Sequence, residues 1–371
     1  MNERNEHPYL MYDSIRATPE LLAQCMDPAI RGRVEALAEA IRMRGVRRLV
    51  LTGCGTSLMI AQCCIHFLTA WTDLDAVAES AFELLHYPTV RLREGDAIIG
   101  FSHTGGTKAV VDFIQDCRAK GYLTAGFLEV PGSRLDTAAE ISVIGPGGKD
   151  GATPKTRSFS TGIFLGAMLA LCLGDRERPE VWAALEHLPE QARWVLTQAE
   201  TPMKTLAKDW LSREHFVLVG SGTNFIAARE GSLKLLEAAN VPALGIQIEE
   251  LAHGNELYLD ESWGVLFLAP QNCKGRERME QDLAGVACAG PDIALITAGD
   301  TGTPILPAKA GRIIPLEEAT DELLSIFLLI LPIQLFAYYT TLFRGKHPDL
   351  ASAVRPAMAE AIQKFHPPGY H

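Results

Sequence analysis

The sequence lacks the features that identify several large classes of protein. It has no run of basic residues, and acidic residues outnumber basic ones by 45 to 34, for a net charge of −11. Nucleic acid is therefore a poor partner for this chain. No stretch reaches about eighteen consecutive apolar residues, so we predict no membrane span. The nearest candidate, 323–343, contains Ser325, Gln334 and two threonines and is expected to be a buried helix.

Signals for export, disulfide bonds and metal sites are missing as well. The N-terminal stretch MNERNEHPYL is charged and has no apolar signal core, which indicates a cytoplasmic protein. None of the eight cysteines forms a C-x-x-C pair, so we expect reduced and mostly buried thiols. The histidines have no ligand spacing such as H-E-x-x-H, and we expect no metal and no other cofactor.

The chain contains an internal repeat. Residues 49–61, LVLTGCGTSLMIA, and residues 216–228, FVLVGSGTNFIAA, match at a constant offset of 167. Each is a short apolar strand, the motif G-x-G-T and an apolar helix. The length of 371 residues and the hydrophobic content of 47% also favour two domains. We predict two duplicated α/β domains, 1–195 with an N-terminal helical segment and 196–371 with a C-terminal helix and tail.

Strands and helices are expected to alternate within each half. Such alternation is typical of a parallel sheet with helices on both faces, here of flavodoxin-like type. A helical stretch, 179–212, is expected to join the halves. The expected strands are 47–52, 75–79, 96–101, 123–128, 140–144, 216–220, 243–248, 263–269, 292–297 and 311–315. The expected helices are 28–44, 57–70, 107–119, 157–174, 224–239, 274–288 and 319–343.

Two loops of the first half combine glycines and hydroxyl side chains at the ends of predicted strands. They are GCGTS at 53–57 and SHTGGT at 102–107. Helix N-termini offer N–H groups and a partial positive charge, glycines permit close approach, and hydroxyls add donors. Because ligands bind where such strands end, we predict that the two loops enclose one phosphate.

Other interpretations of these loops are weaker. One hydroxyl would be enough to cap each helix, and three in six residues exceed that need. A dinucleotide fingerprint fails because Leu58 stands where its third glycine belongs, and no G-K-[ST] Walker motif occurs. The corresponding loop of the second half, PQNC at 270–273, has no Ser or Thr. We therefore expect one phosphate site, in the first half.

Three charged residues share one face of the predicted helix 224–239. Glu230, Lys234 and Glu237 are spaced by four and three residues. The helix should be largely buried because it also carries several large apolar residues. These are Ile226, Leu233 and Leu236. The charges form either a solvated stripe, which is the usual case, or a site.

A carboxylate and an imidazole follow in the segment EELAHG at 249–254. These side chains are the ones best suited to proton transfer at neutral pH. Gly254, directly after His253, predicts a tight turn that holds the imidazole ring in place. A surface histidine in a polar turn is the alternative.

These motifs, in this order, resemble the tandem sugar-isomerase (SIS) domain family. The motifs are GCGTS at 53–57, SHTGGT at 102–107, EGSLKLLE at 230–237 and ELAHG at 250–254. Over residues 30–343 the chain is similar to the isomerase half of glucosamine-6-phosphate synthase and to the fructosamine-6-phosphate deglycases. The resemblance implies a phosphosugar held by Gly55, Thr56, Ser57, Ser102, His103, Thr104 and Thr107.

The resemblance also implies roles for residues of the second half. Glu237 matches the catalytic carboxylate of the family, and His253 matches the histidine that opens the ring or acts as general acid. Glu230 and Lys234 match supporting active-site positions. In the family the histidine comes from the partner subunit, so the resemblance implies a homodimer with a shared active site.

Three departures from the family pattern affect the expected reaction. His103 and Gly106 replace the Gln and Glu of S-Q-S-G-E-T, and Arg157 replaces a lysine. The tail, PDLASAVRPAMAEAIQKFHPPGYH, contains Lys364 but not the motif around the family's Schiff-base lysine. The glutaminase half of the synthases is not in this sequence, so we do not expect a glutamine-using synthase.

We therefore expect a phosphosugar enzyme that works by Glu/His acid–base catalysis. The preferred reaction cleaves an amine conjugate of a ketose 6-phosphate to an aldose 6-phosphate and the amine. An aldose–ketose isomerase or an amino-sugar-phosphate deaminase is the alternative, and a non-catalytic sugar-phosphate sensor is a third. Specificity for the amine is expected in 246–256 and in the tail.

Overall fold

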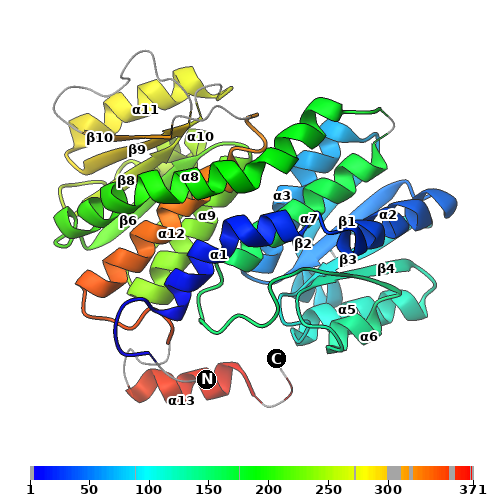
Figure 1. Cartoon of the computed structure of the whole chain (residues 1–371). Helices are drawn as coiled ribbons and strands as arrows, with labels where there is room; N and C mark the ends of the chain where they lie inside the picture. Colours follow the sequence, from blue (N-terminus) through cyan, green and yellow to red (C-terminus); the bar gives the residue numbers. More distant parts are fainter. Residues whose placement is uncertain are drawn as a thin grey trace. The chain divides into compact units, whose positions relative to one another are not determined.

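The computed structural model contains two five-stranded sheets in which every pairing is parallel (Figure 1). It describes residues 4–87, 89–174, 176–270, 273–298, 311–316, 321–350, 356–367 and 369. All ten expected strands are present, with ends that differ by at most one residue. The strands are β1 (Arg48–Gly53), β2 (Asp75–Ser80), β3 (Asp96–Phe101), β4 (Leu123–Leu128), β5 (Ile141–Ile144), β6 (His215–Gly220), β7 (Ala243–Gln247), β8 (Trp263–Leu268), β9 (Asp292–Ala298) and β10 (Gly311–Leu316).

The two sheets have the same topology. The order is β2-β1-β3-β4-β5 in the first sheet and β7-β6-β8-β9-β10 in the second. This is the flavodoxin-like order. The second strand lies on one side of the first, and the third, fourth and fifth strands are added on the other side, so the order of strand addition reverses at the first strand. The repeat offset of 167 residues carries β1 onto β6 and β3 onto β8 at both ends. In both sheets the reversal therefore lies between the first and third strands.

The chain divides into two compact units whose limits differ from the expected split at residue 195. The N-terminal unit comprises 17–150, 155–186 and 356–371, and the C-terminal unit comprises 1–16, 151–154 and 187–355. The boundary lies inside helix α8 (Pro179–Asp209), and the start of α1 (Leu10–Gln24) belongs to the C-terminal unit. The reason for the latter is Asp349, whose carboxylate accepts hydrogen bonds of 2.9 and 2.8 Å from the N–H groups of Leu10 and Met11.

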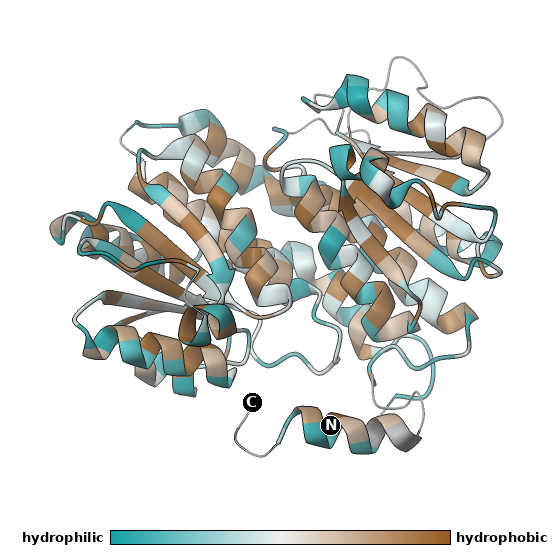
Figure 2. Ribbon diagram, turned by 180° about the vertical axis from the view of Figure 1, so that it is seen from behind, coloured by the Kyte–Doolittle hydropathy of each residue, from teal (hydrophilic) through white to brown (hydrophobic). Residues whose placement is uncertain are grey.

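Helices cover both faces of the sheet in the N-terminal unit (Figure 1). One face carries α2 (Pro28–Met43), α3 (Thr56–Trp71) and α7 (Arg157–Leu173). The other carries α4 (Ala81–His86), α5 (Lys108–Ala119) and α6 (Arg134–Ala138). Val50 and Ile98 of the sheet pack against Val110 and Ile114 of α5, and all four are fully buried. The apolar strands and the inner helix faces form this core (Figure 2).

The C-terminal unit has the same layers. Helices α9 (Thr223–Lys234) and α12 (Ile326–Phe343) cover one face, and a π-helical turn, η1 (Leu235–Ala239), continues α9. The other face carries α10 (Ile248–Glu250), η2 (Leu251–Asn255) and α11 (Arg276–Ala289). The remaining helix, α13 (Pro356–Phe365), belongs to the N-terminal unit. The helix expected at 319–343 begins later, at Ile326, while residues 319 and 320 lie outside the described part.

Helix α12 is long and apolar enough to cross a membrane by length and composition, with a mean hydropathy of 1.9. However, 89% of this segment is buried by the protein around it. Ile333 on α12 meets Gly231 on α9, where a Cβ would come within 2.4 Å of its side chain. The segment therefore serves as a core helix of the C-terminal unit, as the sequence predicted.

Candidate functional site

The two predicted phosphate loops lie side by side in the N-terminal unit. One follows β1 and the other follows β3, and these two strands are neighbours in the sheet. Both loops therefore open at the carboxyl edge, at the reversal point where ligands bind in sheets of this kind. Each loop leads into the N-terminus of a helix, α3 or α5, whose first N–H groups have no partner within the helix.

The hydroxyls of these loops do not serve as ordinary helix caps. Thr107 is the N-cap residue of α5, but its hydroxyl makes no capping bond and lies 3.0 Å from Ser102 Oγ. Gly55, with φ of 56°, is the N-cap residue of α3, so Thr56 and Ser57 follow the cap. Capping thus fails to explain the hydroxyl of Thr107.

Glycine gives the second loop its close packing. Gly105 has φ of +65°, and a Cβ at this position would come within 1.9 Å of Ser133 Oγ. Its N–H donates to the Ser102 carbonyl at 2.9 Å, and the Gly106 N–H donates to Thr104 Oγ1 at 3.3 Å. The Gly106 carbonyl accepts from Arg134, which also donates to the Gly369 carbonyl at 3.0 Å. Arg134 thus links the loop to the C-terminal tail.

His103 is held in its neutral form with a defined proton position. Its Nε2 accepts a 3.2 Å hydrogen bond from the Asp150 N–H, which places the proton of the neutral ring on Nδ1. That Nδ1 is buried and has no hydrogen-bond partner among the described residues. Burial lowers the pKa of His103 to about 4, helped by Lys155 and Arg157 and opposed by Asp150. The loop therefore contains a buried N–H donor, His103 Nδ1–H, for which the described residues supply no acceptor.

Two carboxylates that the sequence analysis missed, Glu129 and Asp150, belong to residues in contact with His103, and Asp150 also lies near Arg157. Glu129, directly after β4, donates its N–H to the His103 carbonyl at 2.9 Å and accepts from the Thr161 hydroxyl. Burial raises the pKa of Glu129. Arg157 Nε lies 3.7 Å from the buried carboxylate of Asp150. The signal that was available for Glu129 is its place at the carboxyl end of a buried strand.

The helix charges of the C-terminal unit are a buried cluster and not a solvated stripe. Lys234 and Glu230 have no exposed surface, and Lys234 Nζ lies 3.2 Å from Glu230 and 2.5 Å from Glu237. Burial alone lowers the pKa of Lys234, but the two carboxylates outweigh it, and the net effect raises the pKa. Glu237 keeps 29% of its side chain exposed. Of the three, Glu237 is the one that a substrate can reach.

Glu237 lies in an irregular part of its helix. The expected helix 224–239 changes at Leu235 into the π-helical turn η1 and ends at Asn240, whose φ is 50°. Turns of this type occur frequently at functional sites. The helix is largely buried, as expected, although Leu236 in the π turn is 44% exposed.

His253 lies on an exposed turn with a fixed ring. Its backbone has φ of −113° and ψ of 54°, and the next residue, Gly254, has φ of +98°, as the tight-turn prediction required. The ring Nδ1 is 2.9 Å from the Glu249 carbonyl and therefore carries the proton, which leaves Nε2 as the acceptor. The side chain is 62% exposed. The polar-turn alternative describes its position correctly.

Glu237 and His253 lie at opposite edges of the same sheet. Helix α9 starts at the carboxyl edge, after β6, and Glu237 follows about 20 Å further along the helix axis. His253 follows β7 at the carboxyl edge. Within the described residues no hydrogen bond or ion pair joins the two side chains.

In the second sheet, the positions that correspond to the two predicted phosphate loops are hydrogen-bonded to Glu322 of the same chain. Thr223 corresponds to Thr56 and Lys274 to Thr107 at the offset of 167. The Thr223 hydroxyl donates to the Glu322 carbonyl at 3.3 Å, and the Lys274 N–H donates to the Glu322 carboxylate at 3.1 Å. Residues 271 and 272 of this loop lie outside the described part. A carboxylate thus takes the position that an anion would need.

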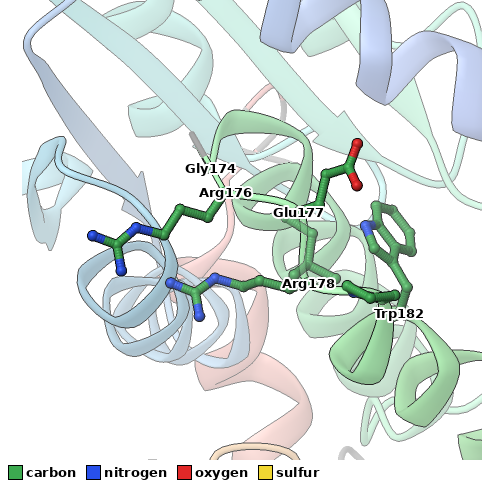
Figure 3. Close-up of a pocket in the computed structure, with 7 residues that line it drawn as sticks. Gly174, Arg176, Glu177, Arg178 and Trp182 are labelled. Carbon is green, nitrogen blue, oxygen red and sulfur yellow. The ribbon is translucent and has the colours of Figure 1, made fainter.

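An open pocket of about 360 Å³ lies elsewhere in the N-terminal unit, between α7 and α8 (Figure 3). Arg176 and Arg178 extend to one side of it and Trp182 lies on the other, beneath the Arg31 guanidinium at 4.8 Å. Helix α7 starts at Arg157, near the carboxyl edge, and its 17 residues cover about 25 Å. The pocket therefore lies at the opposite edge from the phosphate loops.

Among the described residues, no three His, Cys, Asp or Glu side chains are arranged to hold a metal ion. The eight cysteines are free thiols; five are buried, and Cys288 is exposed.

Comparison with known proteins identifies the N-terminal sheet. Residues 42–171 match the SIS domain family, and this part of the chain is an SIS domain. The chain is 26% identical over 299 residues to a glutamine–fructose-6-phosphate aminotransferase (isomerizing) from Aquifex aeolicus. The match covers 80% of this chain and 49% of that protein, so the chain spans about half the length of this curated relative.

Solved structures share the fold over almost the whole chain. The C-terminal domain of glucosamine-fructose-6-phosphate aminotransferase from Francisella tularensis has a TM-score of 0.81, with 18% identity over 94% of this chain and 100% of that chain. Tagatose-6-phosphate ketose/aldose isomerase from Escherichia coli has a TM-score of 0.80, with 19% identity over 93% of this chain and 95% of that chain. The α/β fold with two parallel sheets is thus of SIS type.

Proposed function

We propose that this chain is a phosphosugar enzyme that cleaves amine conjugates of a ketose 6-phosphate. The observation that carries the proposal is the buried lysine between two carboxylates, of which Glu237 alone reaches solvent. Burying the charges of Lys234 and Glu230 costs desolvation energy that apolar residues would not, which favours a functional role for the cluster. A fixed carboxylate beside a cation is suited to removing a proton from carbon.

The phosphate is held by the first-half loops in this proposal. Gly55, Thr56 and Ser57 form one side and the 102–107 loop the other, with helix N-termini as the positive element. His103 replaces an amide of the related sequences and offers its Nδ1–H as a donor. We propose that both halves arose by duplication and diverged, because the second half closes its own loop with Glu322.

The active site is completed by a second copy of the chain. Support comes from the opposite positions of Glu237 and His253 within one copy. If both act on one substrate, the histidine has to come from a partner, as the resemblance implied. A homodimer with shared sites is therefore part of the proposal, together with the expected cytoplasmic location.

The proposed reaction moves one proton between two carbons and then uses water. Glu237 removes a proton from C1 of the 1-amino-1-deoxyketose and a C1–C2 double bond forms. His253 of the partner subunit, in its doubly protonated form, gives its Nε2 proton to the carbonyl oxygen. Return of the proton to C2 gives a C1=N imine. Water adds at C1, the C–N bond breaks, and the amine leaves with a proton. The products are an aldose 6-phosphate and the free amine.

The experiment is a coupled assay for aldose 6-phosphate release. A panel of amino-acid conjugates of fructose 6-phosphate is compared with fructose 6-phosphate and glucosamine 6-phosphate. We expect turnover of a conjugate, loss of that turnover by about 10²-fold or more in Glu237→Gln, and sugar-phosphate binding that persists in the variant. Glu277→Gln, an exposed carboxylate on α11, is the control and should keep full activity.

The other outcomes separate the alternatives. Turnover of the simple phosphosugars alone would replace the deglycase by an isomerase or a deaminase. Thermal stabilisation by these compounds without any turnover would indicate a sensor. Full activity in Glu237→Gln would refute the assigned base.

A further inference from the structure

A chain of ion pairs leads from the body of the C-terminal unit to the His253 turn. Arg278 on α11 lies 2.9 Å from Glu249 and 3.3 Å from Asp282. Glu249 accepts the His253 Nδ1–H through its carbonyl at 2.9 Å, and its carboxylate lies 3.9 Å from the same nitrogen. One residue of α10 thus contacts both the histidine and the arginine.

Helix α11 is a firm support for this contact. Its Met279 and Leu283 pack in one buried cluster with Leu251, the first residue of the turn that carries His253. Asp282 is on the same helix and only 4% of its side chain is exposed. Arg278 is therefore held from behind by a buried carboxylate while it reaches the turn.

The electrostatic surroundings of His253 are mainly acidic. Burial raises the pKa of Asp282 to about 6, with Glu249 and Glu256 adding to the rise and Arg278 opposing it. The charged groups that the turn and α11 place around His253 are Glu249, Glu250, Glu256, Asp282 and Arg278. The sequence motif EELAHG gave no sign of Arg278, because it lies 25 residues further along the chain.

We propose that Arg278 is a positioning residue for His253 and acts through Glu249. It neutralises the Glu249 carboxylate and fixes α10, so that the carbonyl of Glu249 keeps the His253 ring in one tautomer with Nε2 exposed. The proposal rests on the role of His253 in the proposed function. It predicts that the protonation of His253 depends on Arg278 and Glu249 with opposite signs.

The direction of each shift in the His253 titration midpoint depends on which charged side chain, Glu249 or Arg278, remains near the imidazole. In Arg278→Ala the Glu249 carboxylate loses its cation and stabilises the protonated ring, so the His253 titration midpoint moves up by about half a pH unit. In Glu249→Gln the carboxylate is gone and Arg278 stays, so the midpoint moves down. The midpoint is measured by NMR of the His253 ring in the full-length protein, in whatever oligomeric state it adopts, without substrate.

Kinetics supply the second readout. We expect Arg278→Ala to lower kcat by about tenfold with little change in KM, and to move the basic limb of the kcat/KM profile to higher pH, because His253 acts as the general acid. Arg278→Lys should restore part of kcat because it keeps the charge. Arg276→Ala, which breaks the neighbouring pair of 3.0 Å with Glu280 on the same helix, is the matched control and should change neither readout.

The outcomes distinguish this inference from the proposed function. Opposite shifts of the NMR midpoint support the role of Arg278 even if no substrate of the panel is turned over. Midpoint shifts in the same direction in both variants, or no shift in either, would overturn the role of Arg278, even if the enzyme turns over a substrate. A loss of kcat without a shift would reduce Arg278 to a structural role.

Discussion

Buried charge in this chain occurs where a second charged or polar group compensates it. Lys234 is enclosed by Glu230 and Glu237, and Asp150 lies near Arg157. An ionised group without such compensation would shift its pKa and become neutral. His103 is instead neutral, because burial and then the nearby cations lower its pKa and a backbone N–H occupies its Nε2. At this scale the 102–107 loop, the proposed phosphate loop, is neutral but rich in donors.

The neutral state of His103 predicts a pH dependence of stability. An unfolded histidine titrates at 6.5 and His103 at about 4, so the native state binds fewer protons between these values. Stability from this residue is complete above pH 6.5 and is lost as the pH falls towards 4, by about 3 kcal/mol in total. We expect His103→Gln to remove this loss, measured by urea unfolding at several pH values between 7 and 4.

A matched variant checks the cause. His86, on α4 of the same unit, is exposed, and His86→Gln should leave the pH dependence of the wild type unchanged. A His103→Gln protein that still loses the same stability over this range would contradict the neutral assignment.

At the scale of elements, the strand-to-helix turns carry the strictest sequence requirement. Gly53 and Gly220 end β1 and β6, and two residues separate each of them from the helix that follows. A Cβ on Gly53 would lie 2.5 Å from the backbone carbon of Ser57, and one on Gly220 would lie 2.4 Å from the Asn224 oxygen. Since these neighbours are backbone atoms of the following helix, no side-chain movement relieves the clash.

Alanine at either position should therefore destabilise its own unit. We expect Gly53→Ala and Gly220→Ala each to lower the free energy of unfolding by about 2 kcal/mol or more. The control is Gly32→Ala on α2, where a Cβ meets no atom within 4 Å and alanine favours the helix. Thermal and urea unfolding of the three variants provide the comparison. A stable Gly220→Ala protein would show that the turn adapts.

At the scale of the whole molecule, the two sheets share a topology but differ at their reversal points. The first sheet presents hydroxyls and N–H groups there. The second places the Glu322 carboxylate on the equivalent N–H, and its helix carries the buried ion cluster. At the offset of 167, Glu230, Lys234 and Glu237 correspond to Cys63, Phe67 and Ala70 of α3. In the proposed function each half supplies one part of the site.

This division predicts one sugar phosphate per chain. Calorimetric titration should give a stoichiometry near one, because the second loop is already occupied. Thr107→Val removes a hydroxyl next to the anion and should raise Kd by about 10-fold or more. Thr223→Val, the variant at the second half's loop, should leave Kd and stoichiometry unchanged. Two bound molecules per chain would contradict the one-site assignment.

Much of this fold was determined by local sequence. Apolar runs bounded by glycine and hydroxyl residues specify the strands, since strands and helices bury side chains with different periods. The offset of 167 specified two similar halves, and the G-x-G-T motifs located both turns after the first strands. These features depend on neighbours along the chain, and all ten expected strands were found.

Tertiary structure decided what the sequence left open. Only packing shows that Lys234 is enclosed, that Leu236 is partly exposed, and that Glu237 and His253 end at opposite edges of one sheet. Only contacts between distant segments reveal Arg278 beside Glu249 and Glu322 in the second loop. Burial and ion pairing depend on residues far apart in the chain, whereas sequence periodicity registers only residues a few positions apart. The sequence by itself therefore determined the elements and candidate residues, and the tertiary structure decided which of those residues carry buried charge and which meet.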